Sequence, residues 1–173
     1  FEGALAERVA LLEGLPVAAL DEVLESRIRP DPGAATLVRT MRALGAATAL
    51  VSGGFTHFTG PVAARAGFAE HRANRLETRA GRLTGHVVPP VLGREAKLAA
   101  LVEIAGRIGA TPAEAIALGD GANDAAMIEA AGLGIGYRPK PALAAVSDAA
   151  LRHSDLSAAL HLQGIPESAF LRG

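Results

Sequence analysis

Three features of this 173-residue sequence predict an α/β fold in which helices cover both faces of a parallel sheet. Short apolar runs that suit buried strands alternate with segments that suit amphipathic helices. Half of the residues are hydrophobic but only 3% are aromatic, and 38 are alanine, which favours closely packed helices around a small-residue core. A chain of this length buries about 70% of its unfolded surface, enough for one compact domain with a small appendage.

Composition excludes several classes of protein. The 17 basic and 18 acidic residues nearly balance, which argues against a nucleic-acid surface or a polybasic membrane surface. No apolar run approaches the roughly 18 residues that span a bilayer. Cysteine is absent, which excludes disulfides and thiolate metal sites. The chain starts at Phe1 without a signal-like segment, so we expect a soluble protein whose natural start lies upstream.

The first thirty residues read as two short helices. The first helix is expected over 4–12, with Leu5 and Val9 on one face, and the second over about 17–25. Pro30 and Pro32 cannot continue a helix, because each proline lacks a donor and restricts the residue before it. The sequence therefore predicts a boundary near residue 30.

Beyond this boundary, helices and strands alternate. Gly45 is typical of a residue that ends a helix, Pro61 fits the first turn of another, and Ala80-Gly81 suits a hairpin. The expected helices span 34–44, about 61–67, 95–108, about 123–131 and 141–146, and the expected strands span 46–51, 75–78, 83–88, 115–118, 133–136 and 149–152.

Two loops with polar chemistry follow predicted strands, where ligands of parallel sheets bind. In residues 119–128 (GDGANDAAMI), Asp120 lies between two glycines. Asp124 follows four residues later, in the first turn of a predicted helix. Carboxylates with water and phosphate are what Mg²⁺ prefers, although either aspartate alone would suit a turn or a helix N-terminus. Ser52, which precedes two glycines, offers a hydroxyl and backbone N–H groups for phosphate, or a plain helix N-cap.

Lys97 stands out in an arginine-rich chain with two lysines. It falls in the first turn of a predicted helix, where the helix dipole disfavours a cation by roughly 0.3–1 kcal/mol. A solvated surface lysine is the alternative, but neutralisation of a phosphate explains this position better.

These motifs resemble those of the haloacid-dehalogenase-type phosphohydrolases. Residues 119–128 resemble the fourth motif of that superfamily, VSGGF at 51–55 resembles the second, and Lys97 stands where the third-motif lysine is expected. Within the superfamily, the segments FEGALAERVALLEGLP, SGGFTHF, ANRLE, LTGHV and AAGLGIGY are similar to phosphoserine phosphatases. The resemblance runs from Phe1 to about Leu156. It implies a Rossmann-like core over 31–173, with a hairpin at about 71–89, and a small helical cap that includes 1–30.

The resemblance also implies a role for each motif residue. Asp120 would ligate Mg²⁺, Asp124 would support the metal site, and Phe1 and Arg8 would line the amino-acid end of the substrate. Ser52, Gly53, Lys97 and Asn123 would hold the phosphoryl group, and Ser52, Lys97 and Asp124 would be the catalytic residues present. The implied reaction is Mg²⁺-dependent hydrolysis of O-phospho-L-serine in serine biosynthesis. It implies a cytoplasmic enzyme with a small-molecule substrate and no nucleic-acid or membrane partner.

One element of the resembled mechanism is missing. The family uses an aspartate nucleophile in a DxDx(T/V) motif, but the aspartates here stand at 21, 31, 120, 124, 148 and 155. The nucleophile, the acid/base and the central strand that carries them are therefore expected upstream of Phe1, and the fragment alone is expected to be inactive. Open strand edges would pack poorly or pair with another chain, so a homodimer is one expectation. The alternatives are an enzyme for another small phosphomonoester and a nucleophile-less module that binds phospho-amino acids.

Overall fold

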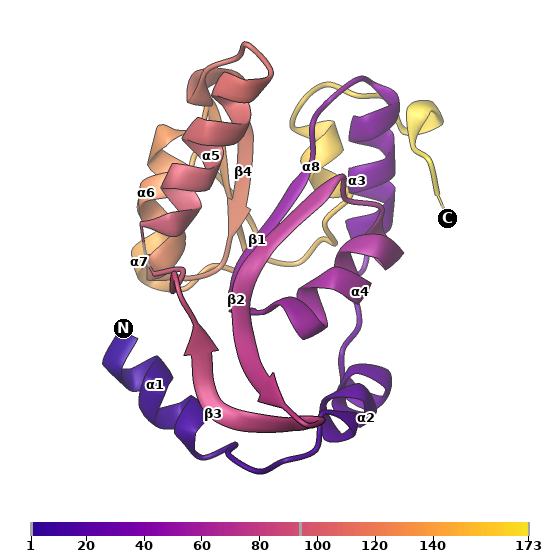
Figure 1. The fold of residues 1–173 in the computed structure, drawn as a ribbon. Helices are drawn as coiled ribbons and strands as arrows, with labels where there is room; N and C mark the ends of the chain where they lie inside the picture. The colour runs from indigo at the N-terminus through magenta and orange to yellow at the C-terminus, as the bar shows by residue number, and fades with distance from the viewer. Residues whose placement is uncertain (1, 94, 173) are drawn as a thin grey trace. The chain divides into compact units, whose positions relative to one another are not determined.

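The computed structural model describes residues 2–93 and 95–172 (Figure 1). The chain divides into two compact units: unit 1 comprises Phe1–Pro30 and Ala49–Gly93, and unit 2 comprises Asp31–Thr48 and Arg94–Gly173. One of the changes from one unit to the other lies between Pro30 and Asp31. Unit 1 also takes in residues 49–93, which belong to the core in the prediction from the sequence. The functional division into a cap and a core therefore stays a prediction.

Unit 1 is built on a three-stranded sheet of order β1-β2-β3. Its elements are α1 (Glu2–Ala10), α2 (Ala18–Arg27), β1 (Ala49–Phe55), α4 (Thr56–Ala66), β2 (Glu70–Arg79) and β3 (Arg82–Val88). The beginning of β2 pairs in parallel with β1, and the rest of β2 pairs in antiparallel fashion with β3. The predicted hairpin is therefore confirmed, and the long curved strand β2 also joins it to the parallel pair (Figure 1).

The core of unit 1 forms where α1 meets the hairpin. Val9 of α1 packs with Leu76 of β2 and Leu83 of β3, and all three side chains are buried. Leu5 lies beside them, as the spacing of the first helix predicts.

Two elements of unit 1 begin at other residues than predicted. Strand β1 starts at Ala49 and runs on to Phe55, so Ser52 lies within a strand and not in the loop after it. The strand extends this far because its pairing with β2, after a register shift beyond Val51, resumes at Phe55. Helix α4 starts at Thr56, so Pro61 lies inside the helix rather than in its first turn.

Unit 2 contains a parallel sheet of order β4-β5-β6 with helices on both faces. On one face, Ala117 of β4 packs with Ile128 and Leu143 from two helices. On the other face, Ile135 of β5 packs within a cluster that includes Leu37 from a third helix. The elements of unit 2 are α3 (Ala34–Ala43), α5 (Ala96–Arg107), η1 (Pro112–Glu114), β4 (Ile116–Gly119), η2 (Ala122–Asp124), α6 (Ala125–Ala130), β5 (Leu133–Tyr137), α7 (Pro141–Ala144), β6 (Ala149–Leu151), α8 (Ala158–His161) and η3 (Glu167–Ala169).

The predicted α/β class with a parallel sheet is thus confirmed. Within the described residues the strands form two sheets, and the outer strands β1, β3, β4 and β6 each have one edge without a strand partner. None of the helices in residues 2–93 and 95–172 has the length and apolar character that crossing a membrane requires.

Candidate active site

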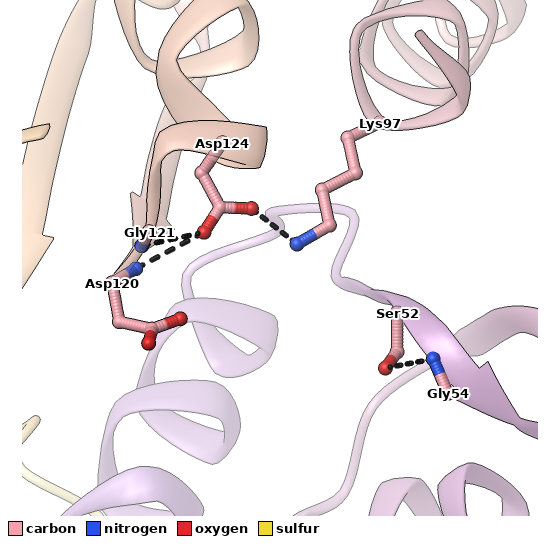
Figure 2. Close-up of polar contacts among 6 residues, drawn as sticks. All are labelled: Ser52, Gly54, Lys97, Asp120, Gly121 and Asp124. Atoms are coloured by element: carbon pink, nitrogen blue, oxygen red, sulfur yellow. Dashed lines mark hydrogen bonds and ion pairs between the residues drawn. The ribbon is translucent and has the colours of Figure 1, made fainter. Parts of the chain in front are cut away.

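Asp124 is the most constrained side chain of the predicted site. It is 1% exposed, at the end of η2, and its carboxylate turns back toward the end of β4 (Figure 2). The Oδ2 atom accepts hydrogen bonds from the backbone N–H groups of Asp120, at 3.1 Å, and of Gly121, at 3.2 Å. The loop after β4 is therefore held by hydrogen bonds from its backbone to the side chain of Asp124.

Gly119 makes this arrangement possible. A Cβ atom at position 119 would lie 2.5 Å from the Cβ of Asp124 and 2.6 Å from its Cγ, closer than side-chain atoms approach. The glycine is required here for space, since any side chain would displace the carboxylate.

Lys97 completes the surroundings of Asp124. Its Nζ forms an ion pair with Oδ1 of Asp124, with the lysine side chain 16% exposed and the aspartate side chain 1% exposed (Figure 2). The lysine lies in the first turn of α5, where the helix dipole disfavours a cation, and the carboxylate offsets this cost. An ammonium group carries three donors, so two remain for another acceptor.

Asp120 is held differently from Asp124. Its backbone is fixed on both sides, because its N–H bonds Asp124 and its carbonyl accepts a hydrogen bond from the Lys140 N–H at 2.9 Å. Its side chain is exposed and makes no hydrogen bond or ion pair within the described residues. Both carboxylate oxygens are therefore available to a ligand.

This donor set fits Mg²⁺. Across residues 2–93 and 95–172, no group of three or more His, Cys, Asp or Glu side chains is arranged to hold a metal. Mg²⁺ commonly takes one or two protein carboxylates and keeps water and phosphate as its other ligands, which an exposed Asp120 could satisfy.

Unit 1 carries Ser52 and Gly53 on β1. The Oγ of Ser52 accepts a hydrogen bond from the Gly54 N–H at 3.0 Å (Figure 2). The hydroxyl proton of Ser52 is not used in that bond. The carbonyl of Gly53 accepts a hydrogen bond at 3.0 Å from the side chain of Asn74, which is not among the predicted site residues.

Of the remaining predicted site residues, two are exposed and one lies outside the described residues. Arg8 is exposed on α1 and forms no ion pair within the described part of the chain, and Asn123 is exposed in η2. Phe1 lies outside the described residues. Lys97, Asp120 and Asp124 thus come together within unit 2, whereas Arg8, Ser52 and Gly53 belong to unit 1.

A family model of haloacid dehalogenase-like hydrolases matches residues 1–129. The chain belongs to this family. Among relatives, it is 43% identical over 165 residues to the phosphoserine phosphatase SerB2 of Mycobacterium tuberculosis, covering 95% of this chain and 40% of that protein. It is 42% identical over 166 residues to a phosphoserine phosphatase of a Polaromonas species, covering 94% of this chain and 70% of that protein.

The chain is also similar to solved structures of phosphoserine phosphatases. A probable phosphoserine phosphatase from Vibrio cholerae superposes with a TM-score of 0.90 at 33% identity, over 98% of this chain and 52% of that one. A substrate-bound phosphoserine phosphatase complex superposes with a TM-score of 0.87 at 36% identity, over 94% of this chain and 77% of that one. The chain therefore spans between two fifths and about three quarters of the length of these four proteins.

Proposed function

We propose that this chain forms part of a phosphoserine phosphatase, which hydrolyses O-phospho-L-serine to L-serine and phosphate with Mg²⁺. The observation that carries the proposal is the arrangement around Asp124, with Lys97 on one oxygen and two backbone N–H groups on the other. This arrangement leaves Asp120 free for a metal. The relatives that are about 40% identical over most of the chain support the substrate.

In the proposal, residues of this chain bind the phosphoryl group. Lys97 would use its two remaining donors, Ser52 would donate its unused hydroxyl proton, and Gly53 and Asn123 would complete the contacts. Asp120 would hold Mg²⁺, which when bound neutralises phosphate charge and orients the phosphate. Asp124 acts indirectly, since its carboxylate keeps the Lys97 ammonium and the Asp120 backbone in place.

The proposed reaction needs an aspartate nucleophile and a second aspartate two residues later. No two aspartates in this sequence have that spacing. The proposal assigns attack to an aspartate of a DxDx(T/V) motif outside these 173 residues. Its carboxylate oxygen would form a bond to phosphorus while the bond from phosphorus to the serine oxygen breaks, and a second aspartate would protonate that oxygen. The second aspartate would then take a proton from a water molecule, whose oxygen would form a bond to phosphorus while the bond from phosphorus to the first aspartate breaks, which releases phosphate and the free carboxylate.

Arg8 is proposed to recognise the carboxylate of the substrate. An exposed guanidinium without an ion pair can grip a carboxylate through two parallel hydrogen bonds. Phe1 is proposed to line the same end of the substrate.

The test is release of phosphate from a panel of esters: phosphoserine, phosphothreonine, homoserine phosphate and a phosphomonoester without a carboxylate. The 173-residue chain is assayed with Mg²⁺ and with a chelator, beside the same chain extended upstream by a segment with DxDx(T/V). We expect turnover by the extended chain alone, dependent on Mg²⁺, with phosphoserine preferred.

Other outcomes separate the alternatives. Preference for the ester without a carboxylate would contradict the substrate assignment and favour a phosphatase for another small phosphomonoester. Tight calorimetric binding of phosphoserine without release of phosphate by either chain would favour a binding module.

A further inference from the structure

Asn74 is the buried polar side chain of unit 1 that touches a predicted phosphate-binding residue. It lies in β2 with 1% exposure, on the same face of the strand as the buried Leu76. Its Nδ2 donates to the carbonyl of Gly53 at 3.0 Å, and its Oδ1 accepts from the N–H of Leu92 at 2.7 Å. Both ends of the amide are therefore used, one on each of two backbone segments.

The contact with Gly53 occurs at an irregularity in the strand pairing. The register between β1 and β2 shifts between Val51 and Phe55, so Gly53 and Gly54 lie in an irregular part of the ladder. Two consecutive glycines have more backbone freedom than any other pair of residues. At this irregularity the Asn74 side chain supplies a hydrogen bond to the Gly53 carbonyl.

From this geometry we propose that Asn74 is a positioning residue for phosphate binding, and this inference rests on the proposed function. By holding the Gly53 carbonyl, Asn74 fixes the peptide between Gly53 and Gly54. The same peptide carries the Gly54 N–H that bonds Ser52 Oγ, so its orientation also sets the direction of the Ser52 hydroxyl. Asn74 touches neither the substrate nor the metal in this proposal.

The second contact holds a further backbone segment of unit 1. The buried amide ties the Ser52–Gly54 segment to the backbone at Leu92, near the end of this unit. A buried amide with two satisfied partners favours one geometry strongly, because losing either partner leaves a polar group unpaired.

In the chain extended upstream by the DxDx(T/V) segment, the experiment compares N74L and N74D with the same chain without substitutions, by titration calorimetry of inorganic phosphate with Mg²⁺ and by amide hydrogen exchange at Leu92. Leucine removes both contacts, whereas an aspartate carboxylate can still accept from Leu92 but cannot donate to Gly53. We expect N74L to lose exchange protection at Leu92, N74D to keep it, and both variants to bind phosphate roughly 10- to 100-fold more weakly.

The control is T40V, because Thr40 is also 1% exposed and its Oγ1 accepts from the Leu171 N–H at 2.9 Å, within unit 2. We expect T40V to lower thermal stability and to leave phosphate affinity unchanged. Wild-type affinity in folded N74L and N74D, or equally weak binding by T40V, would overturn the positioning role. An unchanged chain that binds no phosphate would instead overturn the proposed function, and the exchange data would still report whether Asn74 holds Leu92.

Discussion

Unit 2 holds Asp124 with three contacts from its own residues, whereas unit 1 presents Arg8 on an open helix surface without an ion pair in the described residues. The first arrangement suits a group whose position must not change, because the carboxylate is buried and both of its oxygens have partners. The second suits recognition, since an exposed guanidinium can adapt to an incoming carboxylate. The comparison shows that preorganisation is concentrated on the proposed phosphate and metal side.

The largest effect is expected at Asp120, the proposed ligand of Mg²⁺. In the extended, active chain, Asp120→Asn should lower Mg²⁺-dependent turnover of phosphoserine by at least about 100-fold, because an amide is a weaker ligand than a carboxylate. Titration calorimetry of Mg²⁺ with inorganic phosphate should show a parallel loss of metal affinity. Asp31→Asn, at another exposed aspartate, is the control and should change neither quantity.

Removal of the Lys97 charge tests how much unit 2 depends on its ion pair. Lys97→Met leaves a carboxylate that is 1% exposed with two backbone donors, so the free energy of unfolding should fall by about 3 kcal/mol. Urea denaturation measures this change.

Lys140→Met is the matched control, because Lys140 is the other lysine and its side chain is exposed. It should change the free energy of unfolding by less than about 0.5 kcal/mol. Adding Asp124→Asn to Lys97→Met should restore part of the lost stability, and a double variant that is less stable still would contradict the role given to the pair.

Gly119→Ala tests the space that Asp124 occupies. The added Cβ would meet the Asp124 side chain at 2.5 Å, so the loop must shift, at a cost of about 1–3 kcal/mol. Gly106→Ala in α5 is the control, because a Cβ there meets nothing within 4 Å. It should stabilise the helix by about 0.5–1 kcal/mol, so thermal melts of the two variants should move in opposite directions.

The smallest effect is expected in unit 1. Arg8→Ala should raise the KM for phosphoserine about 10-fold, since the paired charge-assisted hydrogen bonds to the carboxylate are lost, and should leave the KM for a phosphomonoester without a carboxylate unchanged. Steady-state kinetics of the extended chain with both substrates measure the difference. Arg27→Ala removes an exposed arginine from α2 and serves as the control. An equal loss with both substrates would contradict recognition of the carboxylate by Arg8.

The sequence predicts the elements of this chain better than the contacts of its site. The helix over 95–108 and the hairpin strands follow from periodicity, and they occur within one or two residues of the predicted limits, apart from the longer β2. The start of α4 could not be predicted from Pro61, because a proline inside a helix and one in its first turn leave the same local signal.

The candidate site shows the same contrast. The pattern of residues 119–128 singles out Asp120 and Asp124, but it contains nothing that distinguishes the exposed carboxylate from the buried one. That difference depends on Lys97, which is 27 residues away in the chain. Asn74 did leave a signal, a polar residue on the buried face of β2, and strand alternation with Leu76 could have identified it.

The hydrogen bonds from Asp120 and Gly121 to Asp124 also have a consequence for inhibitors. These two N–H groups form an anion-binding niche that the protein fills with a tethered carboxylate. A free anion would compete against a group whose effective concentration is set by a covalent link rather than by diffusion. Compounds designed against this loop should therefore bind the Lys97 ammonium and the Asp120 carboxylate. They should not be designed to displace the Asp124 carboxylate from the two N–H groups.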